Sequence, residues 1–78
     1  MRLFMLIKSF LIQTKPNSAK SLSQDLGELP GIELYPADKH DLIILVLESE
    51  DASSEQELMA KINSFSTVMN MSLVSAFS

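Results

Sequence analysis

The residues of this chain that could do chemistry are few, and most of them gather in two short polar stretches. The first holds His40, the only histidine, beside Asp38 and Asp41. A general base needs a nucleophile and a pocket, and this spacing matches no metal-ligand motif. We therefore interpret His40 as a solvent-exposed turn residue. With no cysteine, no phosphate-binding glycine loop and no Ser/His/Asp set, the sequence predicts no enzyme, no metal site and no bound cofactor.

The second polar stretch is the acidic run Glu48–Asp51, which precedes a predicted helix. Acidic side chains are favourable at a helix N-terminus, and this role is sufficient to explain Glu50 and Asp51. Glu48 has two interpretations: it either belongs to the same solvated loop or points outwards from a strand, where its carboxylate could pair with an incoming arginine. The sequence leaves both open.

Length and composition predict one small globular domain that spans residues 1–78. Hydrophobic residues make up 46% of the chain and charged residues 21%, as in folded domains. The net charge of −4 argues against nucleic acid as a partner and favours a basic peptide or protein segment. The absence of cysteine favours a cytoplasmic location.

The N-terminal stretch Met1–Ile7 begins like a secretory signal, with a positive charge before an apolar run. Lys8 interrupts this run after five apolar residues, and no small-x-small cleavage motif follows before Pro16. We therefore interpret the stretch as leading into a first strand. No segment approaches the roughly 20 apolar residues of a membrane span, so no membrane insertion is expected.

Apolar spacing and turn residues predict four strands and two helices. The strands are expected at residues 5–14 and 32–35, in the apolar run between Asp41 and Glu48, and at residues 67–77. The first helix is expected to begin near Ser18 and to end at Pro30–Gly31. Its apolar stripe consists of Ala19, Leu22, Leu26 and Leu29. The second helix is expected to begin with a capping box, Ser54–Glu57 or Ser53–Gln56.

The order of these elements, βαββαβ, is that of the α+β ferredoxin-like sandwich. In that fold the antiparallel strands lie in the order 4-1-3-2, and both helices pack on one face of the sheet. The third strand is then central. Its six consecutive apolar residues agree with that position, because a central strand is covered more fully than an edge strand.

Because side chains alternate along a strand, each predicted strand divides into two sets. The almost wholly apolar set is expected to face the helices: Leu6, Phe10, Ile12, Ile32, Leu34, Ile43, Leu45, Leu47, Met69, Met71 and Leu73. Lys8 falls in this set, and we expect it near an edge of the sheet. The opposite set supplies the candidate binding residues: Ser9, Leu11, Gln13, Glu33, Tyr35, Ile44, Val46, Glu48, Ser72 and Val74.

This second face has an apolar centre and a polar rim, and two interpretations of it stay open. Antiparallel sheets often leave one face to water with scattered apolar residues on it. An exposed apolar centre is equally typical of a surface that binds a partner.

Four stretches of the chain resemble the NapD family. They are Ser9–Gln13 in the first strand, Leu29–Glu33 after the first helix, Glu48–Asp51 after the third strand, and Ser72–Val74 in the fourth strand. They follow one another in the family's order and together span nearly the whole chain. None of them is a catalytic signature.

The resemblance implies a ferredoxin-like fold and a chaperone that is not an enzyme. NapD proteins are small cytoplasmic chaperones of the periplasmic nitrate reductase. The resemblance implies that the second face holds the twin-arginine signal peptide of the catalytic subunit precursor as a helix. Export would then wait until the molybdenum cofactor and the iron–sulfur cluster are in place, and the chaperone itself would bind neither.

An alternative of another class is a small ferredoxin-like regulatory or ligand-binding domain that dimerises face to face. A homodimer through stacked sheets is compatible with the apolar second face. Ligand binding would require a set of histidine, asparagine or aromatic residues in a pocket, and the lone His40 does not provide one.

Overall fold

A computed structural model of the chain describes residues 6–77, with all of their side chains except those of Asp38 and Phe77. The elements are β1 (Leu6–Thr14), α1 (Ala19–Leu26), β2 (Ile32–Ala37), the 3₁₀ turn η1 (Asp38–His40), β3 (Leu42–Ser49), α2 (Ala52–Asn63) and β4 (Val68–Phe77). Met5, expected as the first strand residue, and residues 1–4 before it lie outside the described residues.

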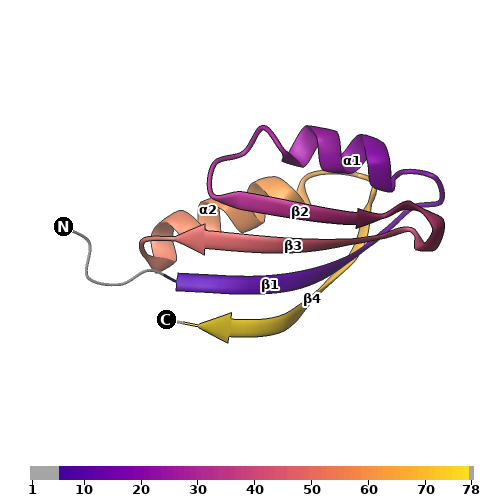
Figure 1. The fold of residues 1–78 in the computed structure, drawn as a ribbon. Helices are drawn as coiled ribbons and strands as arrows, with labels where there is room; N and C mark the ends of the chain where they lie inside the picture. Colours follow the sequence, from indigo (N-terminus) through magenta and orange to yellow (C-terminus); the bar gives the residue numbers. More distant parts are fainter. Residues whose placement is uncertain (1–5, 78) are drawn as a thin grey trace.

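The strands form one antiparallel sheet in the order β2-β3-β1-β4, and both helices lie on the same face of it (Figure 1). The predicted α+β ferredoxin-like fold, with the first and third strands central, is therefore confirmed. A sheet with helices on only one side leaves its other face without a covering layer.

The core lies between the sheet and the helices. Its buried residues are Phe10, Ile12, Ala19, Leu22, Leu26, Ile43, Leu45, Leu47, Leu58 and Ile62. The apolar residues predicted to face the helices on the first three strands all contact or belong to this core, apart from Leu6, which is half-buried. Burial of this set fixes which side of each strand points away from the helices.

The helix boundaries differ from the expected ones because side chains and turns outside the helices decide them. Asp51 caps α2, since its carboxylate accepts a hydrogen bond from the Ser54 backbone N–H at 2.8 Å. Both expected capping boxes are therefore wrong. Hydrogen bonds from Ser54 hold the pKa of the Asp51 carboxyl below its usual value. The first helix ends at Leu26, before the expected Pro30–Gly31 stop, although Leu29 in the following turn still packs on the core.

Two strands also differ from expectation. β2 continues to Ala37 through Pro36. Proline has no N–H to donate, and an edge strand tolerates this because one of its sides has no neighbouring strand to bond. Lys8 lies on the central strand β1 and not near a sheet edge. Its Nζ is 2.6 Å from Oε1 of Glu55 on α2, so an ion pair with the helix layer accommodates the charge.

β4 departs from regular alternation at two places. Its register with β1 shifts between the Gln13 and Thr14 pairs and again between the Ser9 and Phe10 pairs, which leaves Met69 and Val74 without partners. Met69, expected to face the helices, is 65% exposed at the first shift. Leu73 pairs with Phe10 on the helix side, but it is 56% exposed because β4 is an edge strand.

Gly31 begins the return of the chain into β2 at a point of close backbone approach. Its φ is +73°, and its carbonyl accepts a hydrogen bond from the Glu48 N–H at 2.8 Å. A Cβ at this position would lie 2.6 Å from the Glu48 carbonyl oxygen. Only glycine fits both the left-handed conformation and this contact.

We predict that Gly31→Ala lowers the free energy of unfolding by more than about 1 kcal/mol, because alanine is strained at this φ and also meets the Glu48 carbonyl. Urea denaturation followed by circular dichroism measures the effect. Gly27→Ala is the matched control, since Gly27 has a φ of −61°. Equal stability of the two variants would contradict the close approach at Gly31.

Candidate functional site

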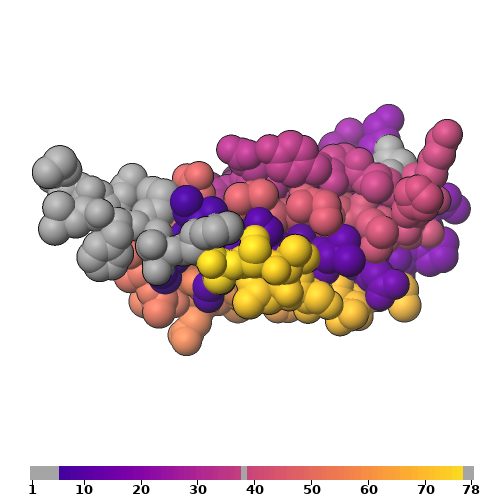
Figure 2. All heavy atoms as spheres, turned by 60° about the horizontal axis from the view of Figure 1, so that its bottom comes forward, coloured from indigo at the N-terminus to yellow at the C-terminus, as the bar shows by residue number. Residues whose placement is uncertain are grey.

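The face of the sheet opposite the helices has no helix of residues 6–77 packed over it. Figure 2 shows side chains of all four strands at the surface with no helix over them. We call this surface the open face. Strand pairing gives its described side chains as Ile7, Ser9, Leu11, Gln13, Glu33, Tyr35, Ala37, Leu42, Ile44, Val46, Glu48, Asn70, Ser72 and Ser75.

Cross-strand pairing arranges the open face in rows, because paired residues of an antiparallel sheet point to the same side. The central row contains Tyr35, Ile44, Leu11 and Ser72, and the row beside it contains Glu33, Val46, Ser9 and Ser75. The predicted binding residues on the first three strands therefore lie together.

The centre of the open face is apolar and accessible. Ile44 is 38% exposed and Tyr35 is 55% exposed, while their neighbours Leu11 and Val46 are half-buried. These side chains come from three adjacent strands. Such an arrangement can bury an apolar surface of a partner without rearrangement of the sheet.

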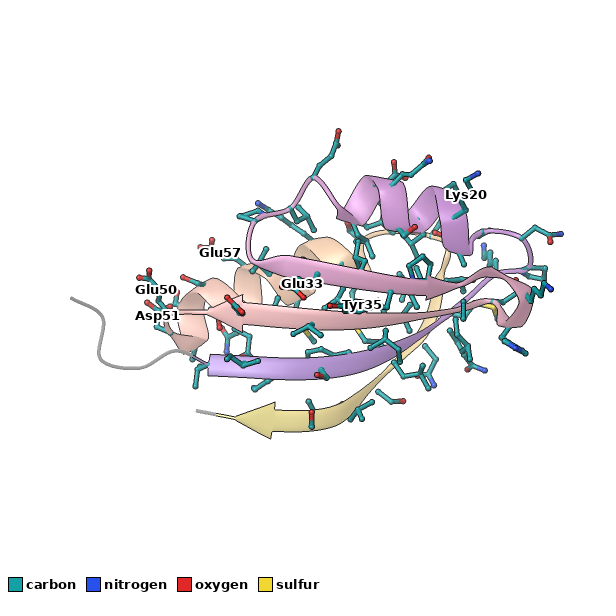
Figure 3. All side chains as sticks on the ribbon, in the orientation of Figure 1. Lys20, Glu33, Tyr35, Glu50, Asp51 and Glu57 are labelled. Carbon is teal, nitrogen blue, oxygen red and sulfur yellow. The ribbon has the colours of Figure 1, made fainter. Side chains whose placement is uncertain are left out.

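A hydrogen bond fixes one carboxylate at the margin of this centre. The Tyr35 hydroxyl donates to Oε2 of Glu33 at 2.7 Å, and Figure 3 shows the two side chains meeting over the sheet. This hydrogen bond, together with the negative charge of Glu33, raises the pKa of the Tyr35 phenol. Glu33 is therefore held in a defined position with its remaining lone pairs available.

The formal charge of the open face is entirely negative. Its described side chains include Glu33 and Glu48 and no lysine, arginine or histidine. Glu48 lies one row further along the strands than Glu33, on the neighbouring strand. A cationic group placed over this part of the sheet would meet two carboxylates and no competing base.

β4 contributes differently from the alternation that the sequence predicts. Ser72 lies on the open face as predicted and pairs with Leu11, but Val74 is the residue without a partner at the register shift, and Ser75 takes the position opposite Ser9. The candidate list also omitted Ile7 and Leu42. The alternation of the first strand already places Ile7 on this face, and continuing the alternation of the third strand by one residue would have identified Leu42.

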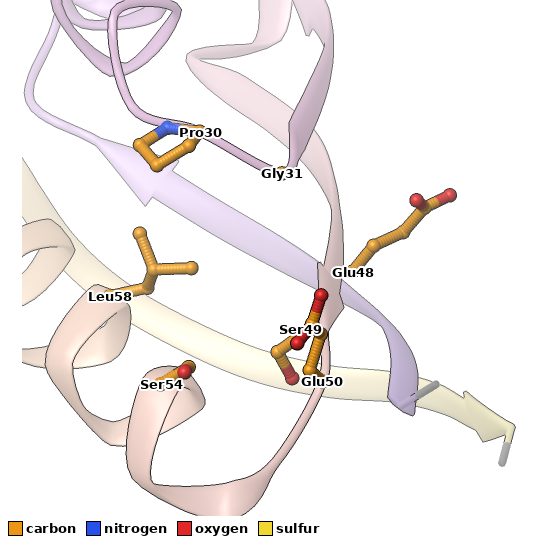
Figure 4. Close-up of a pocket in the computed structure, with 7 residues that line it drawn as sticks. All are labelled: Pro30, Gly31, Glu48, Ser49, Glu50, Ser54 and Leu58. Carbon is orange, nitrogen blue, oxygen red and sulfur yellow. The ribbon is translucent and has the colours of Figure 1, made fainter. Parts of the chain in front are cut away.

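A pocket of about 260 Å³ lies outside the open face, between β3 and the start of α2. It is lined by Pro30, Gly31, Glu48, Ser49, Glu50, Ser54 and Leu58. In Figure 4 the Glu48 side chain points away from the space between Pro30 and Leu58, so its carboxylate belongs to the open face and not to the pocket.

The polar turn around His40 is the other place where the sequence offers side chains that could do chemistry. His40 is exposed, and Oδ1 of Asp41 accepts a hydrogen bond from the Asn17 backbone N–H at 3.0 Å. Among the residues that the structure describes, no group of three or more His, Asp, Glu or Cys side chains could hold a metal ion. In the same residues no helix has the length and apolar character needed to cross a membrane.

Comparison with known proteins gives a family assignment. The sequence model of the NapD protein family matches residues 5–76. The chain belongs to the NapD family. A solution structure, titled as that of the E. coli Tat proofreading chaperone protein NapD, superposes on this member with a TM-score of 0.86. The alignment has 24% sequence identity and covers 96% of this chain and 80% of the E. coli chain. No curated protein matches this sequence closely enough to count as a relative.

We predict that the phenol of Tyr35 titrates above its usual pKa of about 10, and that Glu33→Gln moves the midpoint down. Ionisation would place a phenolate beside the Glu33 carboxylate, so stability from this pair is present at neutral pH and is lost as the pH rises through the raised pKa. Tyr35 is the only tyrosine and the chain has no tryptophan, so absorbance at alkaline pH reports this group alone. Equal midpoints would contradict the hydrogen bond.

Proposed function

We propose that this protein is a chaperone that holds the twin-arginine signal peptide of the periplasmic nitrate reductase catalytic precursor on its open face. Holding the peptide delays export until the molybdenum cofactor and the iron–sulfur cluster have been inserted. The observation that carries this proposal is the accessible apolar centre around Ile44, bordered by Glu33 and Glu48 with no base among the described side chains of that face.

The chemistry of the open face complements that of a twin-arginine signal. Such a peptide joins an arginine pair to an apolar stretch, and an amphipathic helix can bury its apolar side on a surface of matching character. Leu11, Ile44 and Val46 offer the apolar contact. Glu33 and Glu48 offer carboxylates that can accept paired hydrogen bonds from guanidinium groups.

Family membership supports the same role. The E. coli protein with the same fold is described as a Tat proofreading chaperone, and we extend that description to this chain as part of the proposal. The role requires binding and no catalysis, in agreement with a site built from an apolar sheet surface. It also places the protein in the cytoplasm, because the signal peptide is held there before export.

A face-to-face homodimer would bury the same apolar centre and is the competing use of the open face. The two uses differ in what happens when peptide is added. A chaperone monomer takes up one peptide, whereas a stacked dimer must first separate, so that its apparent affinity falls as protein concentration rises. Light scattering with and without peptide distinguishes them.

We predict that Ile44→Asp weakens binding of a synthetic twin-arginine signal peptide by about 100-fold or more, since an unpaired carboxylate would be buried against the apolar side of the peptide. A tryptophan placed in the apolar stretch of the peptide reports binding by fluorescence, because the protein contains no tryptophan.

Leu73→Asp is the matched control for Ile44→Asp. Leu73 is also more than one-third exposed, at 56%, but it shares the helix side of the sheet with Phe10. The Leu73→Asp variant should bind the peptide with the same affinity as the unchanged protein. Circular dichroism should show that both variants are folded. Normal binding by a folded Ile44→Asp variant would contradict the proposed function.

We predict that the affinity for the peptide falls several-fold from low to high ionic strength but is not lost. Exposed ion pairs contribute only about 0.2–1 kcal/mol each and are screened by salt, whereas apolar contacts are not. Titration at several salt concentrations measures the dependence. Complete loss at moderate salt would show that charge, and not the apolar centre, provides the main contact.

A further inference from the structure

The charges of the open face gather at one end of the strands. Glu33 and Glu48 lie at the end where β1 begins, and Glu50 and Asp51 follow β3 beyond the same end (Figure 3). The row at the opposite end is uncharged and consists of Ala37, Leu42, Gln13 and Asn70.

The loops at the uncharged end do not create a second acidic region. Their described side chains include Lys15 after β1, Lys39 in η1 and a single acid, Asp41. The Asp41 carboxylate also accepts a hydrogen bond from the Asn17 backbone. The charge of the described open face therefore changes along its strands, from negative at the end where β1 begins to neutral at the other end.

We propose that this change of charge along the strands fixes the orientation of the bound peptide. Its basic N-terminal end lies over Glu33 and Glu48, and its apolar part runs towards Leu42 and Gln13. The helix then runs in the direction of β1 and opposite to β3. This inference rests on the proposed function, because it concerns the occupant of the same face. Its basis is the charge distribution of the described side chains.

Two electrostatic effects act in the same sense. The basic side chains of the peptide meet the two carboxylates of the face. The N-terminal end of a helix also carries a partial positive charge from its free N–H groups, and carboxylates stabilise it. In the reversed orientation the arginines would lie over the uncharged row, and the negative C-terminal end of the helix would lie over Glu33 and Glu48.

The dimensions of the face set the length of the peptide segment in contact. From Ile7 to Gln13 the strand advances about 20 Å. A helix rises about 1.5 Å per residue, so roughly 13 residues span this distance. The segment in contact therefore consists of a basic beginning and about three helical turns of apolar residues.

Tyr35 is a positioning residue in this arrangement. Its hydroxyl donates to one carboxylate oxygen of Glu33 and leaves the other oxygen to accept from a guanidinium group. Tyr35→Phe keeps the ring and removes the hydroxyl. It should reduce the preference for an arginine peptide over the same peptide with lysines, because a point charge depends less on carboxylate orientation.

The test uses the full chain labelled with ¹⁵N and a synthetic peptide with two adjacent arginines followed by 13 apolar or small residues. A nitroxide is attached to one cysteine at either the N- or the C-terminus of the peptide, and the protein itself has no cysteine to react. The N-terminal label should broaden the amide signals of Gly31, Glu48 and Ile7. The C-terminal label should broaden those of Gln13, Leu42 and Asn70.

The outcomes separate this inference from the proposed function. The opposite broadening pattern, or the same pattern from both labels, would overturn the orientation while leaving the open face as the binding site. Binding with broadening confined to other surfaces, or no binding, would overturn the proposed function itself.

A reversed peptide gives an independent measurement. The same residues in reverse order, with the arginines at the C-terminus, should bind about two- to thirty-fold more weakly, as expected from the loss of two exposed ion pairs. The double change Glu33→Gln with Glu48→Gln should remove this difference. Glu57→Gln, which removes one exposed carboxylate on α2 outside the open face, should preserve it. Equal binding of the two peptides to the unchanged protein would overturn the orientation.

Discussion

The antiparallel register between β1 and β3 decides what each side of this sheet presents. In that register Phe10 opposes Leu45 on the buried side, and Leu11 opposes Ile44 on the open face. A slip of one residue would exchange the two sides of a strand. β3 resists such a slip poorly by itself, because it is apolar on both sides. The apolar side chains that form the exposed centre of the open face therefore also make the register of β3 less specific.

Hydrogen bonds at the two ends of the sheet help to fix the register of β3. At one end Asp41, with a φ of +55°, accepts from the Thr14 N–H at 2.9 Å through its carbonyl. Its carboxylate accepts from Asn17, which is also left-handed, with a φ of +62°. At the other end the Gly31 carbonyl is joined to the Glu48 N–H. The open face is therefore held in register by residues that do not belong to its apolar centre.

The sequence predicts the fold and most of the open face because alternation in the first three strands is strong. Phe10 and Ile12 differ clearly from Ser9 and Gln13, and the turn residues separate the elements. It does not predict the cap of α2, since Asp51, Ser53 and Ser54 are all good capping residues and the exit of β3 selects among them. It also does not reveal that Lys8 pairs with Glu55, a residue distant in sequence. The shifts in β4 are hidden because they follow from pairing with β1 and not from residue type.

The position of β1 between β3 and β4 affects the order in which the sheet assembles during synthesis. β1 precedes both of its neighbours in the chain, and β4 is the last of the four strands. At about 5–20 residues per second, a ribosome needs about 3–13 s to extend the chain from Thr14 to Phe77. During this interval β1 has an open side, because pairing between distant segments cannot precede their synthesis. The sheet is therefore completed only once β4 has been made, because Ser72 and Ser75 at one edge of the open face come from that last strand.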